Sequence, residues 1–114
     1  VFVIGGRVAG CMMRVAGEGT FKANYSRGAK VVAYPLTPLI ERLALDAAQV
    51  LGLEIAGVDL LFDGENFKVC EANSSPGFRG MEECCSANIP GEILSYIKRR
   101  VQERRDNFSP VLHS

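Results

Sequence analysis

The chain has 114 residues, 47% of them hydrophobic and 23% charged, a composition that excludes a wholly disordered protein and predicts one compact domain. Thirteen basic and thirteen acidic residues give a formal net charge of zero, which disfavours nucleic-acid binding by bulk charge. No apolar run approaches the roughly 20 residues that a membrane-spanning helix needs, so we expect neither a nucleic acid nor a membrane as partner.

The first third of the chain is rich in β-prone residues. Residues 1–4 and 8–15 are two such runs separated by Gly5-Gly6-Arg7, which predicts a hairpin. Because the chain begins inside an apolar run, we expect it to be a piece of a longer protein that starts within a strand. Residues 16–29 lack a sustained period and predict a long loop, and ordered loops of that length tend to be functional. Residues 30–34 predict another short strand.

A helix over residues 38–51 has the clearest local signals. Thr37 can cap its N-terminus, and Pro38 suits the first helical position. Apolar residues then recur at helical spacing as far as Leu51, and Gly52 is typical of a helix end.

The second half of the chain predicts a hairpin followed by two helices. Strands over residues 55–62 and 67–72 are joined by a turn-rich stretch, and a short helix is expected over 80–85. A longer helix runs from Pro90 to about Arg104. We attribute the basic residues near its end to the helix dipole rather than to nucleic-acid binding.

Hairpins and helices are segregated along the chain, so we expect an α+β fold. It would be an antiparallel sheet built from hairpins with helices packed on one face. We place the domain at residues 1–105 and a tail at 106–114. An exposed sheet edge would also allow a homo-oligomer.

The four cysteines have neither the spacing of a zinc site nor that of a disulfide framework. No Cys-x-x-Cys pair occurs, and Cys84 and Cys85 are adjacent. We expect reduced, mostly buried cysteines in a cytoplasmic protein.

The richest feature is a carboxylate inside an apolar strand. Asp59 would be costly there without a partner. If the hairpin has a three-residue loop at residues 64–66, Asp59 faces Glu71 and Gly57 faces Asn73, so that three oxygen-bearing side chains share one face and Gly57 leaves empty volume. An even-numbered loop would put the two carboxylates on opposite faces and leave an ordinary hairpin with solvent-facing acids.

Two facing carboxylates repel each other unless a cation or a proton lies between them. Carboxylate and amide oxygens suit Mg²⁺ or Mn²⁺. Mg²⁺ completes its coordination shell with water and substrate phosphates, so a nucleotide is the expected partner.

A second candidate feature is the basic loop. Between residues 14 and 30 the chain has four basic residues and one acid, and it includes several glycines. Guanidinium forks and backbone N–H groups both suit phosphate, although an ordinary solvated loop has the same composition.

Arg14 and seven short stretches together resemble a known family. The stretches are Val1-Phe2-Val3-Ile4-Gly5-Gly6-Arg7-Val8, Gly19-Thr20-Phe21-Lys22-Ala23-Asn24, Arg27-Gly28, Leu36-Thr37-Pro38, Leu51-Gly52-Leu53, Ala56-Gly57-Val58-Asp59-Leu60-Leu61 and Glu71-Ala72-Asn73-Ser74-Ser75-Pro76-Gly77. Over residues 1–97 the chain resembles the C-terminal part of an ATP-grasp ligase of the RimK-type glutamate ligases. The Gly-Val-Asp and Glu-x-Asn-x-x-Pro-Gly pair is its most specific part.

The resemblance implies an ATP-dependent carboxylate–amine ligase. In that reaction a carboxylate attacks the γ-phosphate of ATP, and an amine captures the acyl-phosphate. The resemblance implies that Asp59, Glu71 and Asn73 hold two Mg²⁺ or Mn²⁺ ions that bridge the phosphates of ATP. It also implies that the turn at residues 74–77 shapes the acceptor side. A glutamate ligase acting on a protein or peptide is the expected activity.

The resemblance also assigns roles in the basic loop. It places Lys22, Ala23 and Asn24 along the nucleotide and Arg27 on the γ-phosphate or the acyl-phosphate. Arg14 is expected near the acyl substrate or the transferred phosphate. A complete ATP-grasp enzyme has in addition an N-terminal domain and a lid, which these residues do not contain, so we expect this chain alone to be inactive. The alternative is a non-catalytic nucleotide- or metal-binding module.

Overall fold

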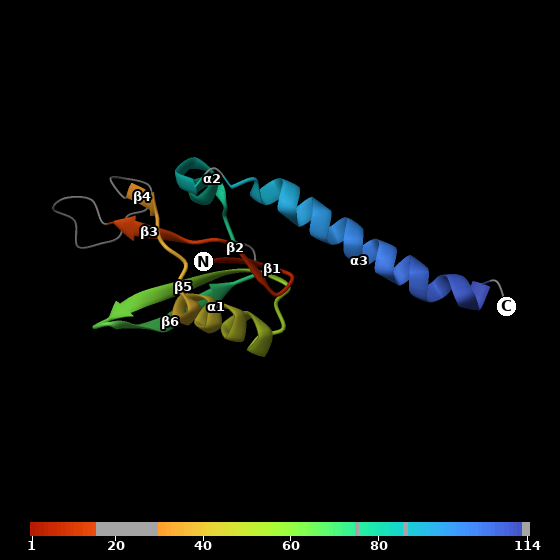
Figure 1. Cartoon of the computed structure of the whole chain (residues 1–114), viewed down its shortest axis with the longest axis horizontal. Coiled ribbons are helices and arrows are strands. Elements are labelled where there is room, and N and C mark those ends of the chain that lie inside the picture. Colours follow the sequence, from red (N-terminus) through yellow and green to blue (C-terminus); the bar gives the residue numbers. More distant parts are fainter. Residues whose placement is uncertain (16–29, 75, 86, 113–114) are drawn as a thin grey trace.

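A computed structural model describes residues 1–15, 30–74, 76–85 and 87–112 of the chain. A four-stranded antiparallel sheet has the order β2-β1-β5-β6, and a separate two-stranded antiparallel sheet pairs β3 with β4 (Figure 1). Three helices accompany the sheets, so the predicted α+β class and its antiparallel hairpins are confirmed. The elements are β1 (Phe2–Ile4), β2 (Arg7–Gly10), β3 (Met12–Val15), β4 (Lys30–Ala33), α1 (Pro38–Val50), β5 (Ile55–Asp63), β6 (Asn66–Asn73), α2 (Arg79–Cys85) and α3 (Ile89–Leu112).

Helices cover both faces of the larger sheet. Figure 1 shows α1 on one side of the sheet and α2 on the other. Val3 packs with α1 in one core cluster, whereas its neighbours Phe2 and Ile4 pack with α2 and the start of α3 in a second cluster. Successive strand residues point to opposite faces, so three consecutive buried residues in β1 require cover on both sides. The expectation that all helices pack on one face is therefore wrong, because α1 covers one face and α2 with the start of α3 covers the other.

The predicted strand over residues 8–15 is divided at Cys11. β2 pairs with β1 in the larger sheet, whereas β3 pairs with β4 in the smaller one. The Cys11 carbonyl accepts a hydrogen bond from the Tyr34 backbone N–H at 3.2 Å, where the chain leaves β4. The chain thus passes from one sheet to the other between β2 and β3.

The local signals for α1 are confirmed. The Thr37 hydroxyl accepts a hydrogen bond from the Ile40 backbone N–H at 3.2 Å, and Pro38 opens the helix. Gly52 follows the last turn with φ of 67°, a left-handed conformation that suits glycine.

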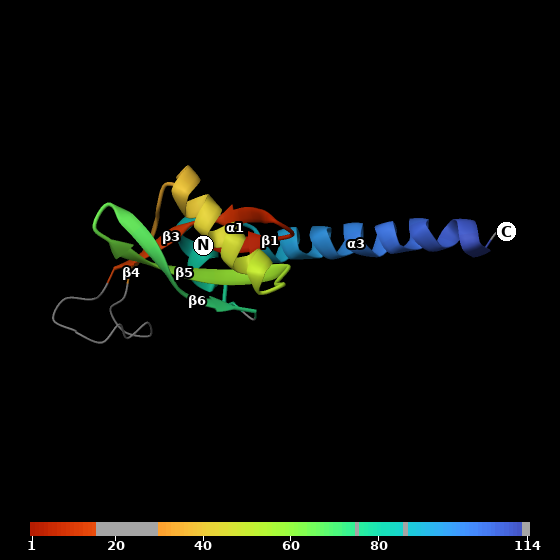
Figure 2. The ribbon, with the colours of Figure 1, turned by 90° about the horizontal axis from the view of Figure 1, so that it is seen from below.

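The third helix is longer than the sequence predicts. α3 runs to Leu112 and therefore continues through most of the segment from Asp106 that we expected to be a tail. It extends away from the sheets (Figures 1 and 2), and the molecule measures 67 × 26 × 21 Å. Because the basic residues 98–105 lie in the middle of a helix, the dipole at its end does not account for them. Within the described residues, no helix combines the length and apolar character that crossing a bilayer requires.

The cysteines differ in part from expectation. Adjacent Cys84 and Cys85 in α2 are joined by a disulfide, so the prediction of reduced thiols is wrong for this pair. Cys11 and Cys70 are free. Cys11 is half-buried, and this burial raises the pKa of its thiol, whereas Cys70 is exposed.

Candidate functional site

The β5–β6 hairpin brings Asp59 and Glu71 opposite each other. Asp59 pairs with Glu71 and Gly57 with Asn73, as the sequence predicts. Directly opposed residues share a face of a sheet, so the carboxylates and the Asn73 amide lie on one side. The predicted convergence of these three side chains is therefore confirmed.

The route to this register differs from the prediction. The loop has two residues, because Asp63 pairs with Asn66, and an uninterrupted ladder would set Asp59 opposite Cys70. The register shifts between Leu60, which pairs with Val69, and Asp59, which pairs with Glu71. Cys70 is the extra residue of this bulge. The expectation of a three-residue loop is wrong, and the bulge restores the pairing that such a loop would have given.

The three side chains line a hollow of about 190 Å³ on the face of the sheet that carries α2. Asp59 is partly exposed and Glu71 is exposed, so solvent reaches both carboxylates.

Arg14 enters the same hollow from the smaller sheet. Its Nη1 lies 3.4 Å from Asp59 Oδ1, and the two side chains are 41% and 35% exposed. The expected catalytic arginine and the expected metal ligand are therefore in contact. The guanidinium supplies a positive charge beside the facing carboxylates, where their repulsion would otherwise be uncompensated.

Gly57 is in close contact with Pro76. A Cβ added to Gly57 would lie 2.8 Å from Pro76 Cβ, closer than real side chains approach. The space opposite Asn73, which we expected to be empty, is thus occupied by the proline of the following turn. The absence of a side chain at Gly57 allows the chain after β6 to fold back over the sheet.

The apolar wall of the hollow was not predicted. Phe2 and Met81 line it from β1 and α2, together with Met12 from β3. Phe2 and Met81 are 3% and 2% exposed and belong to the second core cluster, so the hollow rests on a packed floor. The helical segment around Met81 gave no sequence signal for a role at the site.

Few side chains in the hollow could coordinate a metal ion, and each of them would do so through oxygen. Among the described residues, no group of three or more His, Cys, Asp or Glu side chains is placed to hold a metal ion. Asp59 and Glu71 are only two carboxylates, and the third side chain, Asn73, is an amide. Such a group of three oxygen ligands suits an ion that takes few protein ligands. Lys22, Ala23, Asn24 and Arg27 lie outside the described residues.

Curated relatives are similar over nearly the whole chain. A "Probable alpha-L-glutamate ligase" of Legionella pneumophila (strain Corby) is 39% identical over 106 residues, which is 93% of this chain and 35% of that protein. The protein of the same name from Methanococcoides burtonii is 43% identical over 98 residues, or 86% of this chain and 33% of that protein. The chain therefore spans about a third of the length of these relatives.

Solved structures share the fold. Two structures of the ATP-grasp ligase PsnB superpose with TM-scores of 0.71 and 0.68, at 22% and 27% sequence identity. The matches cover 88% and 85% of this chain and 30% and 32% of the PsnB chains. The first PsnB structure contains a phosphomimetic variant of a minimal precursor, Mg and ADP, and the second contains a minimal precursor.

A model of the RimK-like ATP-grasp domain matches residues 1–97, most of the chain and all of the strands that build the hollow. The chain belongs to the RimK-like ATP-grasp family.

Proposed function

We propose that this chain provides the metal- and phosphate-binding part of an ATP-dependent carboxylate–amine ligase, a glutamate ligase that acts on a protein or peptide in the cytoplasm. The observation that carries the proposal is the pairing of Asp59 with Glu71, beside Asn73 and the Arg14 guanidinium, in one solvent-reachable hollow. The names of the curated relatives support glutamate as substrate, and the precursor bound to PsnB supports a peptide.

The residues of the hollow fit a hard divalent cation. Both carboxylates reach solvent, and their facing arrangement is unfavourable without positive charge. Asp59, Glu71 and Asn73 would hold two Mg²⁺ or Mn²⁺ ions, with phosphate oxygens and water completing the shells. When bound, the ions would neutralise the charge of the ATP phosphates.

The proposed reaction has two steps. A substrate carboxylate oxygen attacks the γ-phosphorus of ATP, the bond to the β–γ bridging oxygen breaks, and ADP leaves. The amine nitrogen then attacks the carbonyl carbon of the acyl-phosphate and loses a proton, and inorganic phosphate leaves as the amide forms. Such transfers depend on positioning and electrostatic stabilisation. We assign Arg14 and Arg27 to the transferring phosphoryl group, and Lys22, Ala23 and Asn24 to the nucleotide.

We further propose that residues 1–105 form the domain and that the ligase needs parts beyond this chain. The PsnB ligase, which binds Mg and ADP in one structure, is about three times as long as the matched part. The 114-residue chain alone would then bind ATP weakly or not at all, because a nucleotide site shared with other domains is incomplete.

Titration with Mn²⁺, followed by electron paramagnetic resonance, tests the metal site in the 114-residue chain. We expect saturable binding that Asp59→Asn and Glu71→Gln each weaken at least tenfold, because loss of an outer-shell partner alone costs about ten- to a hundredfold in metal affinity and loss of a direct ligand should cost no less. Asp63→Asn is the matched control, because Asp63 is a carboxylate of the same hairpin that pairs with Asn66 away from the hollow. Equal binding by all four proteins would overturn the metal assignment.

Trapping with hydroxylamine tests the reaction in a ligase-length protein that contains this chain. Hydroxamate that forms only with ATP and a carboxylate substrate would support the acyl-phosphate. ATP binding without hydroxamate would instead favour the non-catalytic module.

A further inference from the structure

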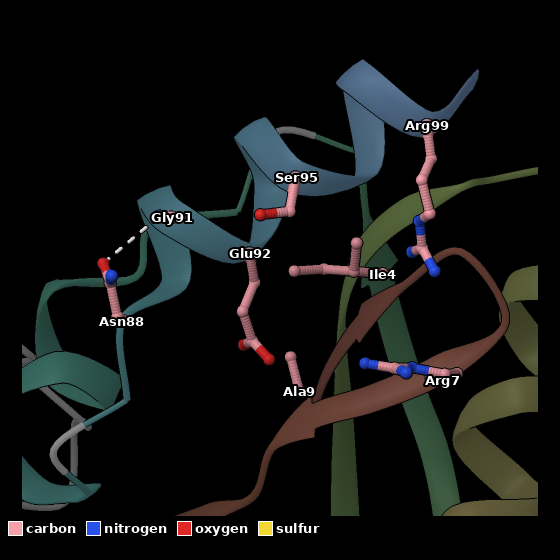
Figure 3. Close-up of a pocket in the computed structure, with 8 residues that line it drawn as sticks. All are labelled: Ile4, Arg7, Ala9, Asn88, Gly91, Glu92, Ser95 and Arg99. Atoms are coloured by element: carbon pink, nitrogen blue, oxygen red, sulfur yellow. Dashed lines mark hydrogen bonds between the residues drawn. The ribbon is translucent and has the colours of Figure 1, made fainter. Parts of the chain in front are cut away.

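A hollow of about 530 Å³ lies between the β1–β2 hairpin and the start of α3 (Figure 3). It shares no lining residue with the hollow beside Asp59. Ile4 and Ala9 from the hairpin form an apolar wall, and Ile4 is only 7% exposed. The site is thus separate from the proposed metal and phosphate site.

One face of α3 supplies the polar wall. Glu92, Ser95 and Arg99 follow each other at three- and four-residue spacing, so they lie along one side of the helix. Arg7, at the start of β2, faces them across the hollow. Figure 3 shows the ends of Arg7, Arg99 and Glu92 directed into the space between the hairpin and the helix.

The charges around this hollow are not paired with each other. Among the described residues, none of the ion pairs includes Arg7, Arg99 or Glu92. Two guanidinium groups directed into one space repel each other, and an anion between them would remove that repulsion. The planar forks of arginine match the oxygens of carboxylate and phosphate groups.

The Arg99 side chain and the backbone at Arg7 are both positioned before any ligand arrives. The Arg99 guanidinium lies over the Tyr96 ring at 5.9 Å from its centre, and the Tyr96 hydroxyl donates a hydrogen bond to Glu54 Oε1 at 2.6 Å. Arg7 follows Gly5 and Gly6, whose φ angles of 57° and 79° fix a tight turn. Arg99 therefore loses less side-chain freedom on binding than an arginine without such a contact would lose.

We propose that this hollow binds a small oxyanion that also carries a hydrogen-bond donor. The oxyanion would lie between Arg7 and Arg99, and a hydroxyl or ammonium group of the ligand would donate to Glu92. A hydroxycarboxylate and a phosphate monoester share this chemistry. The bound ligand would join the β1–β2 hairpin to α3.

Titrations of the 114-residue chain followed by NMR test the proposal with lactate, propionate and glycerol 3-phosphate. We expect saturable binding of lactate or glycerol 3-phosphate at millimolar concentrations, and tighter binding of lactate than of propionate, which lacks the hydroxyl group. If lactate binds more tightly than glycerol 3-phosphate, the ligand is a hydroxycarboxylate, and if glycerol 3-phosphate binds more tightly, it is a phosphate monoester. No saturable binding of either would overturn the proposal.

Variants locate the ligand. Arg7→Gln and Arg99→Gln should each weaken binding about ten- to a hundredfold, the effect of losing a charge-assisted hydrogen bond. Arg42→Gln on α1 is the matched control and should bind as the wild type does. Glu92→Gln should reduce the preference for lactate over propionate. Binding that is lost in Arg14→Gln but kept in Arg7→Gln belongs to the hollow beside Asp59 and would overturn the proposal, whether or not that hollow holds a metal.

Discussion

Arg14 and Asp59 form an ion pair that connects the two sheets, with Nη1 and Oδ1 3.4 Å apart. Arg14 lies on β3 of the smaller sheet and Asp59 on β5 of the larger one. Asp59 also faces Glu71, so the arginine partly offsets the repulsion between the two carboxylates. A cation that binds both carboxylates would have to compete with this guanidinium for Asp59.

The first prediction concerns this competition. Arg14→Gln should tighten Mn²⁺ binding several-fold, because it removes a positive charge beside the proposed ligands. The free energy of unfolding should change by less than about 1 kcal/mol, since both partners are more than a third exposed to solvent. Mn²⁺ titration and urea denaturation measure the two effects. Arg42→Gln is the control, and weaker Mn²⁺ binding by Arg14→Gln than by the control would contradict the prediction.

The second prediction concerns the contact between Gly57 and Pro76. Gly57→Ala should destabilise the chain by about 1–3 kcal/mol, the usual effect of overpacking. The added Cβ would lie 2.8 Å from Pro76 Cβ and push the turn after Asn73 away from the sheet. Mn²⁺ binding should weaken with it, because Asn73 is paired with Gly57.

Two double variants separate this contact from a general loss of packing. Pro76→Gly removes the Cβ that the new alanine meets and should restore Mn²⁺ binding to Gly57→Ala. Pro76→Ala keeps that Cβ and should not restore it. Equal Mn²⁺ affinities of the two double variants would show that the contact does not position Asn73.

The pairing of Asp59 with Glu71 could be predicted from the sequence, but the way it is reached could not. The two-residue loop and the bulge at Cys70 shift the register in opposite directions, so their effects cancel at the site. Register is strongly specified where a strand has one buried face. Most residues of β6 are exposed, so the hydrophobic pattern there does not locate a bulge.

The ends of α1 were predicted well and the end of α3 was not, because, of the two, only α1 has residues at both ends that mark where a helix begins and stops. α1 has a cap, a proline and a glycine at its ends, and each of these acts within a few residues. α3 from Ile97 to Asn107 is exposed throughout, so no burial pattern marks where the helix ends. The unbroken apolar run of β1 is typical of a strand buried on two sides, a signal that our expectation of helices on one face did not take into account.

The third prediction concerns the cap of α1. Thr37→Ala removes the acceptor for the Ile40 N–H and should lower the free energy of unfolding by about 0.5–2 kcal/mol. Thr37→Ser keeps a hydroxyl at the same position and should stay close to the wild type. Urea denaturation followed by circular dichroism compares the three proteins. Equal losses in both variants would mean that the cap hydrogen bond contributes nothing.

The fourth prediction concerns Tyr96, whose hydroxyl donates to Glu54 Oε1 at 2.6 Å. This hydrogen bond, with some burial and the Glu54 charge, raises the pKa of Tyr96 above its ordinary value of 10.0, and Arg100 opposes part of the shift. Only the protonated phenol can donate, and the phenolate would carry a negative charge beside the Glu54 carboxylate.

Because the folded-state pKa is raised, the stabilisation from Tyr96 is fully present below the unfolded-state pKa and is lost as the pH rises through the folded-state pKa. We therefore expect Tyr96→Phe to unfold more easily than the wild type near pH 8 and to lose that difference above about pH 10. Urea denaturation of both proteins over this pH range measures the difference. Glu54→Gln keeps an acceptor without the charge and should therefore raise the pKa of Tyr96 less. In the Glu54→Gln protein, the stability difference caused by Tyr96→Phe should then disappear at a lower pH than in the protein with Glu54. A difference between wild type and Tyr96→Phe that stays constant through the whole range would show that the hydrogen bond to Glu54 does not couple protonation of Tyr96 to folding.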